Sequence, residues 1–206
     1  MLRIWGRTNS INVQKVMWTV GELGLDHERI DAGGAFGGLD TEAYGKLNPN
    51  RRIPCLVDGD LAVWESNAIV RYLAARYGSG SLWPEAPGPR SLADRWMDWK
   101  ITTLMPQLHV MFWGLVRTPE AERDMRAIEA AAEAIVPLWQ LVDHHLEGAP
   151  FLAGESFTMG DIPLAAAFWR YRHLVSELPS LPHVERWYAA LEERPAYRQH
   201  VMLPVT

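Results

Sequence analysis

The sequence contains a single cysteine, Cys55, among its 206 residues. One cysteine cannot form a disulfide within the chain, which is typical of proteins from reducing compartments. No group of cysteines and histidines has zinc-site spacing. His144 and His145 are adjacent, so on a helix their side chains point apart. The sequence therefore predicts a cytoplasmic protein with no bound metal.

Positive charge and long apolar runs are also scarce. The net charge is −5 at pH 7, whereas a nucleic-acid binder needs a basic surface to neutralise phosphates. No apolar run reaches the roughly 18 residues that span a bilayer, and the N-terminus lacks the apolar core of a signal peptide. We therefore expect no nucleic-acid partner, no membrane segment and no leader. The 48% of hydrophobic residues does provide enough apolar surface for a packed core.

The first 77 residues alternate between strand and helix patterns. Apolar runs bounded by turn residues predict strands, and apolar residues at spacings of three and four predict helices. The expected strands are 2–5, 27–30, 55–58 and 62–64, and the expected helices are 13–23, 41–47 and 67–76. The last two strands flank Gly59-Asp60, a hairpin turn. The order βαβαββα predicts an α/β domain over residues 1–77.

The remainder of the chain has no strand pattern. Residues 78–90 are rich in glycine and proline, which predicts a linker. Residues 91–206 predict an all-α domain, with helices over 91–116, 119–147, 157–176 and 181–193, and Pro137 predicts a kink or break in the second of these. Thr158 and Asp161 fit a capping box, with Phe157 and Ile162 at the positions of a hydrophobic staple.

Ser10 lies where the first predicted strand turns into the first predicted helix. The start of a helix offers unpaired N–H groups and a partial positive charge, and both favour an anion. A hydroxyl at this point can donate a hydrogen bond to a bound thiolate. Serine is also a preferred N-cap residue in helices that bind nothing. The residue type and position alone leave both interpretations open.

Three segments of the first domain resemble the glutathione S-transferase family, in particular its bacterial, theta-like, serine-type members. They are Gly6–Val16, Asn48–Pro54 and Trp64–Ile69. The resemblance covers nearly the whole chain, and the helical half matches more loosely. It implies a thioredoxin-like domain that binds glutathione as a cosubstrate, and an all-helical domain that contributes a second-substrate site. It also implies a homodimer that transfers glutathione to a small electrophile.

The resemblance assigns Ser10 as the donor to the glutathione thiolate and Asn12 as a second donor, with Thr8 and Asn9 also within reach. Serine-type members often have proline at the position of Asn12. Members with asparagine there lean toward disulfide reduction. One alternative is therefore a glutathione-dependent disulfide reductase or peroxidase. A second alternative is a non-catalytic ligand-binding module of the same fold.

The resemblance also implies how glutathione is held. Glu65 and Ser66 contact the amino and carboxylate groups of its γ-glutamyl residue. A cis bond before Pro54 turns the Ile53 backbone toward the cysteinyl residue. Arg52, rather than the neighbouring Arg51, contacts the glycyl carboxylate. Simple helix capping and solvated arginines are the alternatives that do not involve binding.

Two further predictions concern apolar surroundings. Cys55 lies within a predicted strand and away from any helix N-terminus, so we expect a buried, unreactive thiol. Four residues share one helical face by spacing and either belong to the core or line the second-substrate pocket: Met105, His109, Phe112 and Trp113.

Overall fold

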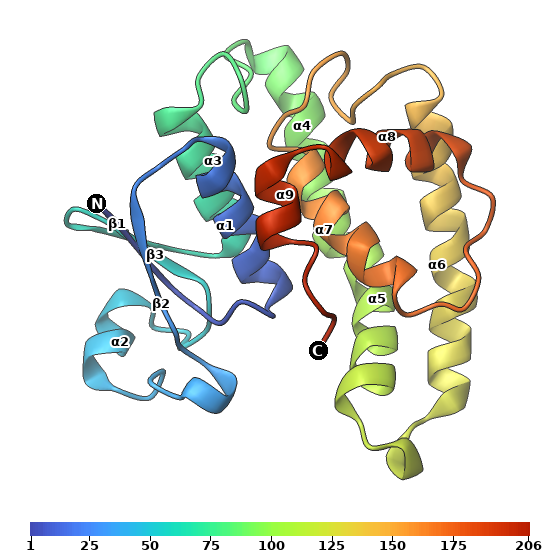
Figure 1. Cartoon of the computed structure of the whole chain (residues 1–206), viewed down its shortest axis with the longest axis horizontal. Helices are drawn as coiled ribbons and strands as arrows, with labels where there is room; N and C mark the ends of the chain where they lie inside the picture. The colour runs from blue at the N-terminus through green and yellow to red at the C-terminus, as the bar shows by residue number, and fades with distance from the viewer.

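The computed structural model describes residues 1–206 and divides them into an α/β half and a helical half (Figure 1). The α/β half contains β1 (Leu2–Trp5), α1 (Ile11–Glu22), β2 (His27–Ile30), a short 3-10 turn (Gly34–Phe36), α2 (Glu42–Leu47), β3 (Cys55–Asp58), β4 (Leu61–Trp64) and α3 (Ser66–Tyr77). The strands are ordered β2-β1-β3-β4 in one sheet. β2 is parallel to β1, whereas β3 is antiparallel to both β1 and β4. The predicted order βαβαββα is confirmed.

The second half is helical, as predicted. Its elements are α4 (Pro87–Trp99), a π segment (Lys100–Leu104), α5 (Met105–Phe112), a second π segment (Trp113–Arg117), a 3-10 turn (Glu120–Glu122), α6 (Met125–Leu146), α7 (Asp161–Arg172), α8 (Pro182–Glu192) and α9 (Pro195–His200). The C-terminus lies between the two halves in Figure 1. None of the helices is both long and apolar enough to cross a membrane.

The helix boundaries differ from the sequence prediction at several places. α4 begins at Pro87, inside the predicted linker, because proline is well suited to the first turn of a helix. The prediction at Pro137 was a kink or a break, and the break is excluded because α6 continues through this residue. Pro137 is exposed, and the carbonyl that it leaves unpaired can bond to water. α7 begins only at Asp161, and α9 has no counterpart in the prediction.

Helix α1 joins the two halves because it packs against α3 on one side and against α7 and α9 on the other. Its Trp18 stacks on Phe157 at 5.4 Å between ring centroids and meets the edge of Tyr197 at 4.7 Å. Glu22 accepts two hydrogen bonds from the Arg194 guanidinium, at 2.9 and 2.6 Å. The helix that follows Ser10 is therefore held by contacts from both halves.

Asp161 is a fully buried carboxylate that organises the start of α7. It accepts hydrogen bonds from the backbone N–H groups of Leu152 and Thr158 and from the Trp187 indole, each at 2.9 Å. Burial raises the pKa of Asp161 to about 6, so the group is ionised at neutral pH. The bond to Thr158 is the one expected of the predicted capping box, and the other two attach a loop and α8 to it.

Candidate functional site

Ser10 immediately precedes α1 in an extended conformation, with φ −88° and ψ 119°. Its carbonyl accepts the backbone N–H of Gln14 at 2.9 Å, which begins the helix. Its hydroxyl makes no capping hydrogen bond to the first turn. Of the two interpretations of this serine, side-chain capping is therefore not the one observed. The half-buried hydroxyl remains free at a helix N-terminus, where an anion is favoured.

The other polar residues around this turn differ in whether their side chains are engaged. Asn9 donates a hydrogen bond to the Thr206 hydroxyl at 2.9 Å, which attaches the turn to the C-terminal segment. Thr8 and Asn12 are both exposed and make no side-chain hydrogen bond within the protein. The structure thus brings Ser10, Thr8 and Asn12 to one helix start with free donor groups.

Glu65 and Ser66 lie at the start of α3. The residue preceding the helix is Glu65, and Ser66 is its first residue, so the helix begins one position earlier than the predicted 67. Glu65 has a positive φ of 67°, an uncommon conformation for a residue with a side chain and one often found at binding sites. Its carboxylate is exposed, whereas Ser66 is buried at the unpaired N–H groups of the helix.

The two neighbouring arginines have different roles. Arg51 donates hydrogen bonds to the carbonyls of Leu39 and Thr41, at 2.9 and 3.0 Å, so it holds the loop before α2. The exposed Arg52 side chain makes no such bond. Of the two, Arg52 is therefore the one with a guanidinium free to contact a ligand, which agrees with the sequence interpretation.

The peptide bond between Ile53 and Pro54 is cis, which confirms that prediction. The preceding carbonyl, that of Arg52, accepts hydrogen bonds from the Tyr44 hydroxyl at 2.6 Å and from the Asn48 amide at 2.7 Å. α2 and the turn that follows it therefore fix the main chain just before the proline.

Cys55 is completely buried in β3, as predicted. Burial raises the pKa of its thiol to about 11. Because the thiolate is the reactive form of cysteine, the side chain is protonated and unreactive at neutral pH.

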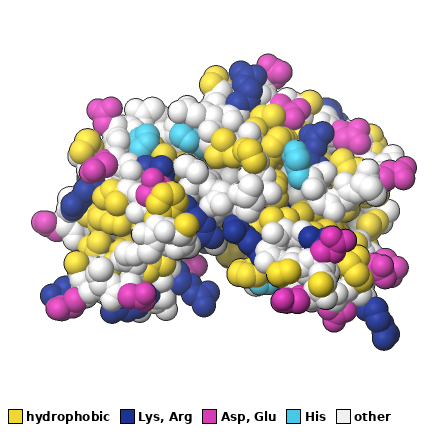
Figure 2. Space-filling view, turned by 60° about the horizontal axis from the view of Figure 1, so that its bottom comes forward, with side chains coloured by type: hydrophobic (Ala, Val, Ile, Leu, Met, Phe, Trp, Pro, Cys, Tyr) yellow, Lys and Arg dark blue, Asp and Glu magenta, His cyan; other side chains and the backbone are white.

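A hollow of about 500 Å³ lies between the two halves. It is lined by Arg7, Thr8, Asn9, Gly34–Phe36, Arg117, Leu203, Pro204 and Thr206. Two of these residues directly precede Ser10, so the hollow adjoins the start of α1. Figure 2 shows Lys and Arg side chains at the notch between the two halves.

The four residues predicted for the second-substrate pocket are not brought together around this hollow. Phe112 is buried beneath the guanidinium of Arg170, with 4.0 Å from the guanidinium carbon to the ring centroid. Met105 is half-buried, whereas His109 and Trp113 are exposed and contact each other at 5.7 Å between ring centroids. Their part in a second-substrate site stays a prediction.

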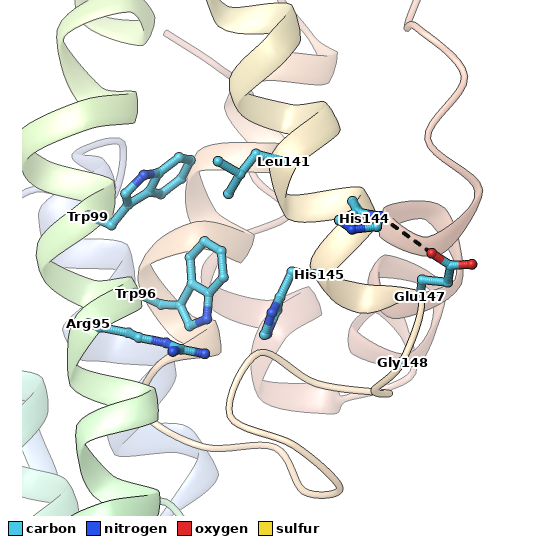
Figure 3. A pocket seen from close by; sticks show the side chains of 8 residues that line it. All are labelled: Arg95, Trp96, Trp99, Leu141, His144, His145, Glu147 and Gly148. Carbon is cyan, nitrogen blue, oxygen red and sulfur yellow. Dashed lines mark ion pairs between the residues drawn. The ribbon is translucent and has the colours of Figure 1, made fainter.

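A separate hollow of about 790 Å³ lies between α4 and α6 (Figure 3). Trp96, Trp99 and Leu141 form its apolar wall, and Arg95, His144 and His145 provide its polar groups. Figure 3 also shows the ion pair between His144 Nδ1 and Glu147 Oε2, 3.4 Å apart, in the lining of this hollow. The hollow contains none of the residues of the three sequence segments, so it is not the candidate glutathione site.

Comparisons with known proteins identify the family. The family model "Glutathione S-transferase, N-terminal domain" matches residues 1–75, and "Glutathione S-transferase, C-terminal domain" matches residues 92–195. The chain is 43% identical over 208 residues to the glutathione S-transferase GstB of Escherichia coli, with 100% of each chain covered. It is 30% identical to glutathione S-transferase 3 of Zea mays, with 97% of this chain and 93% of the relative covered.

Solved structures give the same result. A crystal structure of the theta class glutathione S-transferase from Xanthomonas axonopodis pv. citri, with glutathione bound, matches with a TM-score of 0.95. The two are 50% identical, and the match covers 100% of this chain and 99% of that one. The family predicted from the three sequence segments is confirmed. The chain belongs to the glutathione S-transferase family.

Proposed function

We propose that the chain binds glutathione, holds its thiol as a thiolate at the start of α1, and transfers it to a small electrophile. The observation that carries this proposal is the free Ser10 hydroxyl at a helix N-terminus. A free thiol has a pKa near 8.5, and lowering it by two units takes about 2.7 kcal/mol of preference for the anion. One hydroxyl donor together with the helix end provides an interaction of this size. Asn12 is the candidate second donor.

The remaining contacts of glutathione follow from the groups left free in the site. The exposed Glu65 carboxylate pairs with its amino group, and Ser66 at the start of α3 receives the γ-glutamyl carboxylate. The Ile53 backbone pairs with the cysteinyl residue, and Arg52 pairs with the glycyl carboxylate. Support comes from the Xanthomonas axonopodis relative, whose solved structure holds glutathione.

We place the second substrate between the two halves of the protein. The hollow between the halves is the candidate volume for it because Thr8 and Asn9 place it next to Ser10. Phe112 packs against Arg117, a lining residue of this hollow, with 5.4 Å between the guanidinium carbon and the ring centroid. Met105, His109 and Trp113 do not line this hollow, and their part in a second-substrate site stays a proposal.

We also propose that the protein acts as a homodimer in the cytoplasm. Leu61 and Trp64 on the edge strand β4 are 47% and 38% exposed, and large apolar side chains on an edge strand favour coverage by a partner. Analytical ultracentrifugation tests the dimer, and Leu61→Lys should shift the distribution toward monomer.

Product analysis distinguishes the proposed transfer from its alternatives. With chlorodinitrobenzene as electrophile, we expect the arylated conjugate of glutathione and one equivalent of chloride. A disulfide reductase or peroxidase would instead give oxidised glutathione from hydroxyethyl disulfide or cumene hydroperoxide. The presence of Asn12 favours this alternative. A non-catalytic module would bind glutathione in calorimetry and give neither product.

A further inference from the structure

Three arginines from distant parts of the chain meet at the hollow between the halves. Arg7 follows β1, Arg117 ends the second π segment, and Arg170 lies in the last turn of α7. Burial lowers the pKa of Arg170 to about 10, and repulsion from Arg117 and Arg7 contributes to this shift. The pKa of Arg7 is lowered by burial and by Arg117. Arginine side chains carry a positive charge at neutral pH, so the cluster brings three positive charges together.

None of these arginines pairs with an Asp or Glu side chain. The ion pairs that arginines form in this protein involve other arginines, such as Arg71 with Asp94 and Arg194 with Glu22. Arg170 is only 6% exposed, and its one hydrogen bond is to the Asn9 carbonyl at 3.4 Å. A buried charge without a counter-ion is costly. The cluster is therefore a place where an anion gains more than it would at the open surface.

The arginines are also positioned to face a ligand. Arg7 and Arg117 line the hollow, while Arg170 lies behind them over the Phe112 ring. The Arg7 side chain makes no hydrogen bond within the protein, and it lies beside Gly34 in the lining of the hollow. Arg117 makes one, to the main-chain oxygen of Thr206 at 2.7 Å, so it already holds an oxygen acceptor. A carboxylate at Thr206 would offset one of the three charges and leave the other two.

We propose that this hollow selects electrophiles that carry a negative charge, such as a carboxylate or sulfonate, and that Arg117 and Arg7 bind that charge. The inference rests on the proposed function and names the substrate class of the same site. In the transfer, the glutathione sulfur forms a bond to the electrophilic carbon. The bond from that carbon to its leaving group breaks, the leaving group departs with the electron pair, and the thiol proton goes to solvent.

A matched pair of electrophiles tests the charge preference. Para-chloro-meta-nitrobenzoate is an anion, and para-chloro-meta-nitrobenzamide has nearly the same shape without the charge. Each kcat/KM is divided by the uncatalysed rate with glutathione at the same pH, which removes the difference in intrinsic reactivity. We expect the corrected value to favour the anion, and Arg117→Gln to reduce it about tenfold for the anion and less than about twofold for the amide.

The control variant is Arg95→Gln, which removes the same charge from the exposed surface of α4 and should preserve the preference. Calorimetry should also give unchanged glutathione affinity in Arg117→Gln, because the cluster is assigned to the second substrate. A tenfold loss of glutathione affinity in that variant would assign the arginines to glutathione and overturn the inference. Equal corrected rates for the two electrophiles would overturn it as well.

Binding of the two reaction products separates this inference from the proposed function. The carboxylate and amide conjugates of glutathione are synthesised chemically and titrated into the protein. If the carboxylate conjugate binds about tenfold more tightly and Arg117→Gln removes the difference, the charge preference holds even without turnover. If the amide is turned over but the carboxylate has no advantage in rate or binding, transfer stands and the charge preference falls. Failure of both conjugates to bind would overturn both.

Discussion

The side-chain amine of Lys15 donates a hydrogen bond to Oδ1 of Asn67 at 2.8 Å, and both side chains are buried. The Asn67 amide in turn donates to the carbonyl of Met97 at 2.9 Å. One asparagine thus links α1, α3 and α4. This contact fixes to each other the two helices at whose starts Ser10 and Ser66 lie, and glutathione is proposed to bind at both starts.

The first prediction compares the loss of a hydrogen-bond partner with the loss of the buried amine itself. Asn67→Ala leaves the buried Lys15 amine without its acceptor and removes the hydrogen bond to the Met97 carbonyl, so we expect a loss of about 3 kcal/mol in the free energy of unfolding. Lys15→Met removes the buried polar group while keeping a straight side chain of similar size, so its cost should be smaller. Urea unfolding measures both, with the exposed Gln140→Ala as control. An equal cost for the two variants would contradict this account.

The second prediction concerns pH. Burial, followed by repulsion from Arg170, lowers the pKa of Lys100 from 10.5 to about 7. Between these two values the unfolded chain binds more protons than the folded one, so stability should rise with pH across this window. One such group adds at most about 1.4 kcal/mol per pH unit. Melting temperatures from neutral to alkaline pH should therefore rise more steeply in the wild type than in Lys100→Met. Parallel curves would show that Lys100 does not titrate as stated.

Much of the fold could be predicted because its signals are local. Strands β1 and β3 are short apolar runs with turn residues nearby, and the hairpin turn at Gly59 follows from residue type alone. The helix boundaries were harder. Pro137 is tolerated because it faces solvent, and solvent exposure is a property of the packed helix rather than of the local sequence.

The site could be predicted only in part. Ser10, Glu65 and Pro54 lie in short segments whose residues carry the family resemblance, so they were found. Arg117 and Arg170 carry no such signal, because they meet Arg7 only when both halves are packed together. Lys15 offered one clue, since a charged residue on the otherwise apolar face of a helix indicates a buried polar contact.

The third prediction concerns glutathione affinity. Glu65→Ala and Ser66→Ala should each weaken binding, because each removes a charge-assisted hydrogen bond worth about 1.5–3 kcal/mol. Calorimetry measures the affinity, and circular dichroism verifies that the fold is kept. Glu155→Ala, which removes an exposed carboxylate elsewhere, serves as the control. Unchanged affinity in both variants would move the γ-glutamyl contacts to other residues.

The fourth prediction concerns Cys55. Its thiol is buried and protonated, so Cys55→Ala should keep most of the turnover and lose about 1 kcal/mol of stability from the vacated volume. Steady-state kinetics and thermal unfolding test the two parts. A variant with unchanged melting temperature and glutathione affinity but no turnover would give Cys55 a chemical role that its burial does not suggest.

The fifth prediction concerns Ser10. Because its hydroxyl is free at the start of α1, Ser10→Ala should raise the pKa of bound glutathione and leave glutathione affinity nearly unchanged. Thiolate absorbance, followed against pH, reports that pKa directly. Turnover near neutral pH should fall by about 10- to 100-fold, which corresponds to a loss of about 1.4–2.7 kcal/mol of thiolate stabilisation.

The pH profile then separates two roles for this serine. If Ser10 stabilises the thiolate, the rate of Ser10→Ala should recover at high pH, where glutathione ionises without help. A loss of equal size at every pH would instead indicate that the hydroxyl positions the sulfur. Asn12→Ala and Thr8→Ala are the matched variants, because both side chains have free donors at the same helix start. If one of them abolishes turnover while Ser10→Ala changes neither pKa nor rate, the thiolate donor is that residue. Loss through Asn12 would favour the disulfide-reducing alternative.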